Sequence, residues 1–164
     1  IGRPLPNRTN IVLSRSEIEE SPNVKWANSV STALLLADVD SICRFNSQFF
    51  VIGGEQIYKA FDIYINKVYL TEVFCGNING DAKFEQIFDH DTKESDWIFR
   101  GEDEYKSGPD DDFPFRITCF QRRKPNHRYR VQSEFTGREV EFYKMLDQYE
   151  MAFENDEEQF EFNL

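Results

Sequence analysis

The chain has 164 residues, the size of one ordinary domain, and 40% of them are hydrophobic, so a packed core is expected. Its 30 acidic and 19 basic residues give a net charge of −11, which argues against a protein that binds nucleic acid through its phosphates. No apolar run approaches the roughly 20 residues of a membrane-spanning helix, so we do not expect this chain to be a membrane protein.

Strands and helices are expected to alternate through the first three quarters of the chain. Short apolar runs after turn residues are typical of buried strands, and longer runs with helical spacing favour helices. Strands separated by helical crossovers predict an α/β fold with a mostly parallel sheet that finishes with antiparallel strands. The expected strands are residues 10–14, 48–52, 67–71, 97–100 and 115–120, the last two as an antiparallel pair, and the expected helices are 29–36 and 55–61.

Charge separates a C-terminal segment from the rest of the chain. Residues 131–164 carry ten acidic and two basic side chains, so most of the net charge lies there. A basic cluster, broken by Pro125-Asn126, comes directly before it. We therefore divide the chain into a body of residues 1–123 and a basic-then-acidic tail of residues 124–164.

The tail is expected to contain one amphipathic helix at about 137–153. Thr136-Gly137-Arg138-Glu139 matches a capping box, with Thr136 as the N-cap and Glu139 reaching back to it. Apolar residues then recur at helical spacing from Phe142 to Phe153. This face docks either on its own domain or on a partner domain or subunit, and the sequence leaves both alternatives open.

The three cysteines, Cys43, Cys75 and Cys119, are scattered and form no metal-binding spacing. Such a set favours reduced thiols over a disulfide framework, and a cytoplasmic location is expected. We expect no metal site.

Gly53-Gly54 stands between an expected strand and an expected helix. Glycines let the backbone approach a ligand, and the first turn of a helix offers N–H groups and a positive dipole end to an anion. The pattern is typical of a phosphate-binding turn, although a simple tight turn would read the same way.

Ser14-Arg15 follows the first expected strand, at the end where open α/β sheets bind ligands. A hydroxyl beside a guanidinium suits a phosphate monoester, because the arginine gives charge-assisted hydrogen bonds. The alternative interpretation is a solvated loop arginine.

Taken together and in order, several blocks of the body resemble the dihydrofolate reductase family. The family places similar blocks at similar spacing over roughly residues 1–123. The resemblance implies a dihydrofolate reductase-like α/β fold and an oxidoreductase that reduces 7,8-dihydrofolate to tetrahydrofolate with NADPH, in one-carbon metabolism. The blocks are residues 1–15, 50–58, 69–72, 79–84 and 115–123.

The resemblance implies a substrate site. Arg8 matches an arginine that holds the glutamate-tail carboxylate of folate, and Ile1 and Leu5 match residues that pack on the aminobenzoate ring. Ile52 matches the residue whose carbonyl meets the pterin amino group. Two further matches are Tyr58, near the nicotinamide, and Thr71, which supports the pterin-binding carboxylate.

The resemblance also implies an NADPH site. Ser14 and Arg15 would hold the adenosine 2′-phosphate, and Asn28 stands where the family often has a second basic residue. Gly53 and Gly54 match a diglycine joined by a cis peptide. The backbone from Gly54 through Glu55, Gln56 and Ile57 would bind the pyrophosphate.

The family pattern continues before Ile1, with two strands, a mobile loop and the helix that bears the proton-donating acid. We therefore expect this chain to be a fragment of a longer polypeptide and inactive alone, its catalytic acid being absent. The alternative is a non-catalytic dihydrofolate reductase-like remnant that acts as an interaction or structural subunit through its tail helix.

Overall fold

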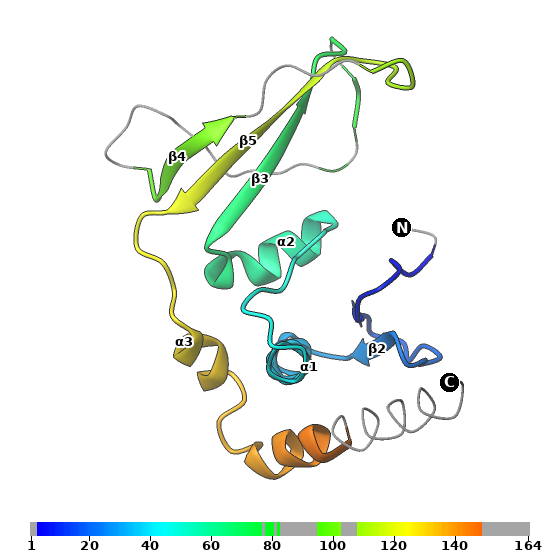
Figure 1. Cartoon of the computed structure of the whole chain (residues 1–164), viewed down its shortest axis with the longest axis vertical. Coiled ribbons are helices and arrows are strands. Elements are labelled where there is room, and N and C mark those ends of the chain that lie inside the picture. Colours follow the sequence, from blue (N-terminus) through cyan, green and yellow to red (C-terminus); the bar gives the residue numbers. More distant parts are fainter. Residues whose placement is uncertain (1–2, 77, 81, 83–94, 103–107, 149–164) are drawn as a thin grey trace, which may run out of the picture. The chain divides into compact units, whose positions relative to one another are not determined.

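The computed structural model describes residues 3–76, 78–80, 82, 95–102 and 108–148 (Figure 1). The chain forms both helices and strands, so the expected α/β class is confirmed. The elements are β1 (Asn10–Leu13), β2 (Val24–Ala27), α1 (Val30–Cys43), α2 (Glu55–Phe61), η1 (Asp62–Tyr64), β3 (Lys67–Val73), β4 (Trp97–Glu102), β5 (Phe115–Arg122) and α3 (Arg128–Ser133), and residues 139–148 are helical as well.

The chain forms two compact units. The first combines the residues up to Phe50 with those from Arg128 on, and the second runs from Val51 to His127. The first unit is therefore built from two distant stretches of sequence. None of the helices that the structure describes has the length and hydropathy needed to span a lipid bilayer.

In the first unit, β1 and β2 form a parallel pair, with Asn10 opposite Val24 and Leu13 opposite Ala27. The 14-residue helix α1 begins after Ser29, whose side chain accepts a hydrogen bond from the Thr32 N–H at 3.2 Å. This is the cap that serine commonly provides. The expected helix at 29–36 is thus confirmed, and it continues to Cys43. Its completely buried residues Leu34, Leu35 and Val39 form the core of this unit.

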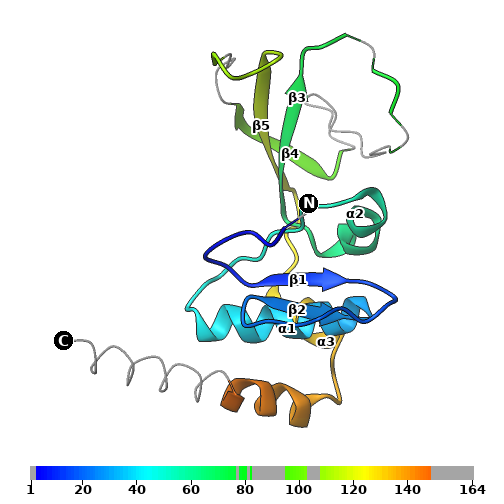
Figure 2. The same ribbon diagram turned by 90° about the vertical axis from the view of Figure 1, so that its right-hand side faces the viewer.

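The segment from α3 to residue 148 packs on α1 in the same unit, and α1 lies between the strand pair and the helix of residues 139–148 (Figure 2). Phe135 is buried and stacks on Phe142, with ring centroids 6.0 Å apart. The described part of the tail therefore docks on its own unit, the first of the two alternatives. Residues 139–148 of the expected helix are helical, and its expected last residues, 149–153, lie outside the described residues.

The expected capping box is wrong in its details. The helix begins at residue 139 rather than next to Thr136. The Glu139 carboxylate accepts a hydrogen bond at 2.9 Å from the Gly137 N–H, not from Thr136. Gly137 has a φ of +87°, a conformation open to glycine, and this turn moves the start of the helix along the chain.

In the second unit, β3, β5 and β4 form an antiparallel sheet in that spatial order. The expected pairing of the last two strands is confirmed, and so are the expected strand at 67–71 and the helix at 55–61. Phe120 and Trp97 are buried in the core of this unit. Arg122 lies over the Trp97 ring at 4.6 Å and donates to the carbonyls of Ile65 and Asp62, which joins the sheet to η1.

No strand forms over residues 48–52, contrary to expectation. Phe50 is 70% exposed and Ile52 54% exposed, and the structure pairs this run with no other described strand. A strand is stabilised by the ladder it makes with its neighbours, and an apolar run shows no sign of whether neighbours are present. As a result the expected mostly parallel sheet is wrong for the described residues, where only the β1–β2 ladder is parallel.

Candidate functional site

The carboxyl ends of β1 and β2 bring the first group of expected site residues together. Ser14 follows β1 and Asn28 follows β2, and the Ser14 N–H donates to the Ala27 carbonyl at 3.0 Å. The Ser14 carbonyl also accepts a hydrogen bond from Trp26 Nε1 at 3.1 Å. Because the two strands are parallel, Ser14, Asn28 and the N-terminus of α1 lie at the same edge.

The side chains at this edge suit an anion. The Ser14 Oγ accepts a hydrogen bond from the Ser16 N–H at 3.2 Å, so the hydroxyl proton is directed elsewhere. Arg15 is exposed and forms no ion pair with any residue of the described ranges. A cation, a hydroxyl and a helix N-terminus are each favourable to phosphate. The Asn28 side chain is uncharged, so Arg15 supplies the positive charge at the carboxyl ends of β1 and β2.

Gly53 and Gly54 lie in the second unit, and the peptide bond between them is cis. Gly53 has a φ of +103°, and a Cβ built on it would lie 3.0 Å from Cε2 and 3.1 Å from the hydroxyl oxygen of Tyr58. Both the backbone angle and the Tyr58 ring therefore require glycine at this position. A Cβ on Gly54 would meet no atom within 4 Å, so the side of Gly54 on which a Cβ would lie is open.

Helix α2 begins directly at this open side. Its first hydrogen bond runs from the Tyr58 N–H to the Gly54 carbonyl at 3.0 Å, and Gly54 has no side chain to cap the helix. The N–H groups of Glu55, Gln56 and Ile57 precede that bond and have no acceptor within the helix. Lys59 pairs with the Glu55 carboxylate at 2.9 Å and offsets its charge. The open space beside Gly54 and these N–H groups are features that suit an anionic group.

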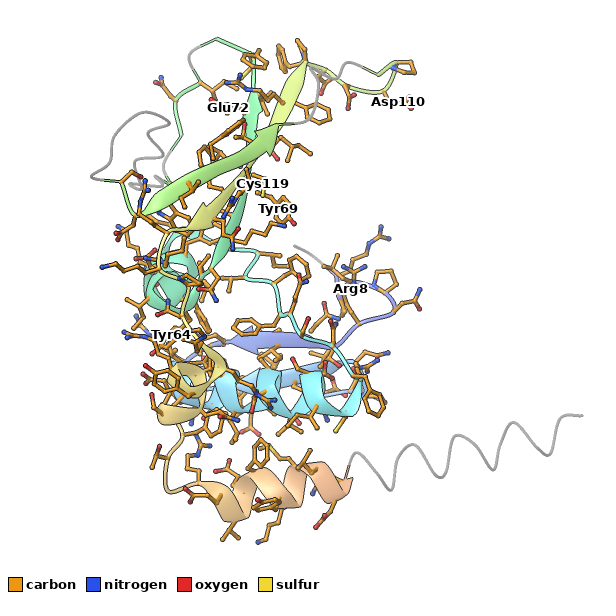
Figure 3. All side chains as sticks on the ribbon, turned by 60° about the vertical axis from the view of Figure 1, so that its left-hand side comes forward. Arg8, Tyr64, Tyr69, Glu72, Asp110 and Cys119 are labelled. Carbon is orange, nitrogen blue, oxygen red and sulfur yellow. The ribbon has the colours of Figure 1, made fainter. Side chains whose placement is uncertain are left out.

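Arg8 and Leu5 lie on the loop before β1, at the other end of that strand from Ser14. Arg8 is exposed (Figure 3). Its Nε donates to the Pro6 carbonyl at 3.1 Å. The guanidinium forms no ion pair with any other described residue, so its terminal nitrogens can bind a carboxylate. Leu5 is half-buried. Ile1, the other residue expected here, lies outside the described residues.

The remaining expected site residues belong to the second unit. Tyr58 is on α2 against Gly53, and Ile52 directly precedes the diglycine. Thr71 is exposed on β3, opposite Ile117 of β5. The structure thus gathers Ile52, Gly53, Gly54 and Tyr58 around the start of α2, while Thr71 lies on the sheet.

One residue of the first unit was not singled out by the sequence. The side-chain amide of Asn10 binds the backbone of the loop that carries Leu5 and Arg8. Its Oδ1 accepts a hydrogen bond from the Leu5 N–H at 2.9 Å. Asparagine commonly binds nearby backbone in this way. The sequence feature that could have indicated this role is the turn-like run Pro-Asn-Arg-Thr-Asn at residues 6–10. This run does not show which backbone groups the Asn10 amide binds.

The chain is similar to proteins of one known family. A family model described as dihydrofolate reductase matches residues 1–122. A dihydrofolate reductase of Buchnera aphidicola subsp. Acyrthosiphon pisum is 40% identical over 84 residues, which are 51% of this chain and 47% of that protein. Those of Haemophilus influenzae and Bacillus subtilis are 39% and 37% identical, over 53% and 59% of this chain and 49% and 51% of their own lengths. The chain spans about half the length of the curated relatives that it matches.

Proposed function

This chain belongs to the dihydrofolate reductase family, and we propose that it serves in the NADPH-dependent reduction of 7,8-dihydrofolate to tetrahydrofolate. The observation that carries the proposal is the diglycine turn: Gly53 lies against Tyr58, and the open space beside Gly54 leads to the first turn of α2. This turn lies within the residues that the family model matches.

For the substrate, we propose that Arg8 binds a carboxylate of the folate glutamate tail. A planar guanidinium forms two parallel hydrogen bonds with a carboxylate, and the exposed Arg8 has its terminal nitrogens available for them. Leu5 and Ile1 would pack on the aminobenzoate ring. The Ile52 carbonyl would accept from the pterin amino group, with Thr71 in a supporting role.

For the cofactor, we propose that Ser14 and Arg15 bind the 2′-phosphate and that the backbone of residues 54–57 binds the pyrophosphate. The exposed Arg15 beside the start of α1 and the open side of Gly54 support these assignments. Tyr58 would lie near the nicotinamide. When bound, NADPH supplies the hydride that reduces the pterin.

Arg8 and Arg15 are exposed positive charges on a chain of net charge −11, which suits the binding of anionic ligands. Each is exposed, and neither is neutralised by a carboxylate within the described ranges. A local cation on an acidic protein guides an anion to one place, because the surrounding acids repel it elsewhere. The proposed roles of Arg8 and Arg15 follow this distribution of charge.

The test is an assay of the native protein that carries this sequence. NADPH absorbance is followed before and after dihydrofolate is added, and consumption that depends on dihydrofolate is expected. A folded native protein that binds neither compound would contradict the proposal. Binding of NADPH without turnover would instead support the role of a non-catalytic relative.

A further inference from the structure

The side chain of Asn10 makes a set of hydrogen bonds that the proposed roles of Leu5 and Arg8 do not explain. Its Oδ1 accepts from the Leu5 N–H at 2.9 Å. Its Nδ2 lies 3.0 Å from the Leu5 carbonyl and 3.1 Å from each of the Arg8 and Asn23 carbonyls. One amide thus holds both backbone groups of Leu5, the carbonyl of Arg8 and the turn before β2.

The loop has few other means of keeping its shape. Pro4 and Pro6 have no N–H to donate, although their rings fix φ, and Asn7 takes a left-handed φ of +58°. The Arg8 side chain is itself bound to this backbone, since its Nε donates to the Pro6 carbonyl. A guanidinium has five N–H donors, so this bond sets its direction and leaves the terminal nitrogens for a ligand.

A second tether holds the residue between Arg8 and Asn10. The Thr9 hydroxyl donates to the Asp40 carboxylate of α1 at 2.5 Å, and Arg44 donates to both partners, at 3.1 Å to Thr9 and 3.0 Å to Asp40. This network anchors the middle of the loop to α1, but it touches neither Leu5 nor the Arg8 carbonyl. Among the residues that the structure describes, only the Asn10 amide is hydrogen-bonded to both ends of the Leu5–Arg8 turn.

We propose that Asn10 is a positioning residue, which fixes the Leu5–Arg8 turn so that the Arg8 guanidinium meets the tail carboxylate of the substrate. The inference rests on the proposed function, because the binding of the tail carboxylate by Arg8 is itself part of that proposal. Asn10 acts through Arg8 on the aminobenzoyl-glutamate tail and has no role in the reduction of the pterin ring.

The principal variant is Asn10→Leu in the native protein, which keeps the side-chain size and removes every hydrogen bond of the amide. The KM for dihydrofolate is expected to rise by about tenfold or more, because a binding group displaced by even 1 Å loses much of its effect. The kcat is expected to stay unchanged. Turnover of a dihydropterin without the aminobenzoyl-glutamate tail is expected to stay unchanged as well.

A second variant guards against a folding defect. Asn10→Asp keeps an acceptor for the Leu5 N–H and loses the donors to the three carbonyls. Its matched control is Asn7→Asp, which adds the same charge to the same exposed loop, at a side chain with no hydrogen bond among the described residues. The rise in KM is expected to be several times larger for Asn10→Asp than for Asn7→Asp.

The decisive comparison repeats Asn10→Leu in an Arg8→Ala background. If Asn10 acts through Arg8, the second substitution adds little to the KM for dihydrofolate. An equal effect with and without Arg8, or an equal loss with the tailless dihydropterin, would mean that Asn10 only supports the fold, and would overturn the inference. Failure of the proposed function would differ, since the unsubstituted protein would then not reduce dihydrofolate at all.

Discussion

Arg128 Nε donates to the carboxylate of Asp38 at 2.7 Å, and Asp38 is only 6% exposed in the middle of α1. Gln132 of α3 reaches the other oxygen of the same carboxylate at 3.4 Å. A buried acid therefore depends on a cation ninety residues further along the chain. The hydrogen bond that Arg128 donates to Asp38 also raises the pKa of Arg128 above its usual value.

Replacing Arg128 with methionine is expected to destabilise the first unit. The change leaves the Asp38 carboxylate buried without its main partner, at a cost of about 1–3 kcal/mol in the free energy of unfolding. Urea unfolding measures the effect. The matched control is Arg130→Met, on the same helix, because Arg130 is exposed and its side chain binds no described residue. Equal losses in the two variants would show that Arg128 contributes nothing through Asp38.

The start of the helix at 139–148 is expected to weaken in acid. Arg138 binds the Glu141 carboxylate at 2.6 and 2.7 Å and lowers the pKa of that acid below 4.5, and the Gly137 N–H lowers the pKa of Glu139. A lowered folded-state pKa stabilises the fold above the unfolded value, and this stabilisation is lost as the pH falls through the folded value. The stability difference between the unsubstituted protein and Glu141→Gln should therefore shrink below about pH 4.5. A difference that does not change with pH would contradict the expectation.

Gly53→Ala is expected to damage both the stability and the NADPH affinity of the protein. The added methyl group would enter a left-handed backbone position and lie 3.0–3.1 Å from the Tyr58 ring. Gly76→Ala is the control, because Gly76 also has a positive φ, of +74°, but no atom within 4 Å of the new methyl group. The difference between the two variants, expected at about 1–3 kcal/mol in thermal or urea unfolding, isolates the contact with Tyr58.

Arg8→Ala is expected to raise the KM for dihydrofolate by about 10- to 100-fold, the range of a lost charge-assisted hydrogen bond. The KM for NADPH should stay within about twofold, since the proposed roles place Arg8 only on the substrate tail. Steady-state kinetics on the native protein measures both constants. Arg3→Ala, at another exposed arginine of the same N-terminal stretch, provides the comparison. If Arg8→Ala changes neither constant, the assignment of Arg8 is wrong.

Arg15→Ala is expected to reduce the preference for NADPH over NADH by about tenfold or more, because the lost cation acts only on the phosphate that distinguishes them. The affinity for NADH in the same variant is the internal control and should not change. Arg15→Lys should recover part of the preference, since it restores the charge without the planar fork. An unaltered ratio in Arg15→Ala would remove Arg15 from the cofactor site.

The elements that sequence predicted well are those decided locally. The helix at Glu55–Phe61 follows a diglycine and keeps the bounds expected for it, and the strand at Lys67–Val73 alternates clearly between its two faces. Residues 48–52 show the opposite case. Their apolar character was visible, but a ladder needs partners that no local pattern specifies. Strand β2 was missed because Lys25 interrupts its four residues, which therefore lack the continuous apolar run that revealed the equally short β1.

Within the candidate site, the sequence indicated the residues that carry charge or conformational freedom, such as Arg8, Arg15 and Gly53. It did not indicate what holds them. The bonds from Asn10 to Leu5 and Arg8, and the fit of the Tyr58 ring against Gly53, depend on coordinates that residue types alone do not supply.

The discontinuous first unit has a consequence for synthesis on the ribosome. Domains commonly fold in the order in which they are translated. Here Asp38 emerges early, while Arg128 and the buried Phe135 emerge only after the whole stretch from Val51 to His127 has been made. The face of α1 that they cover therefore stays uncovered in the nascent chain until translation has passed the second unit.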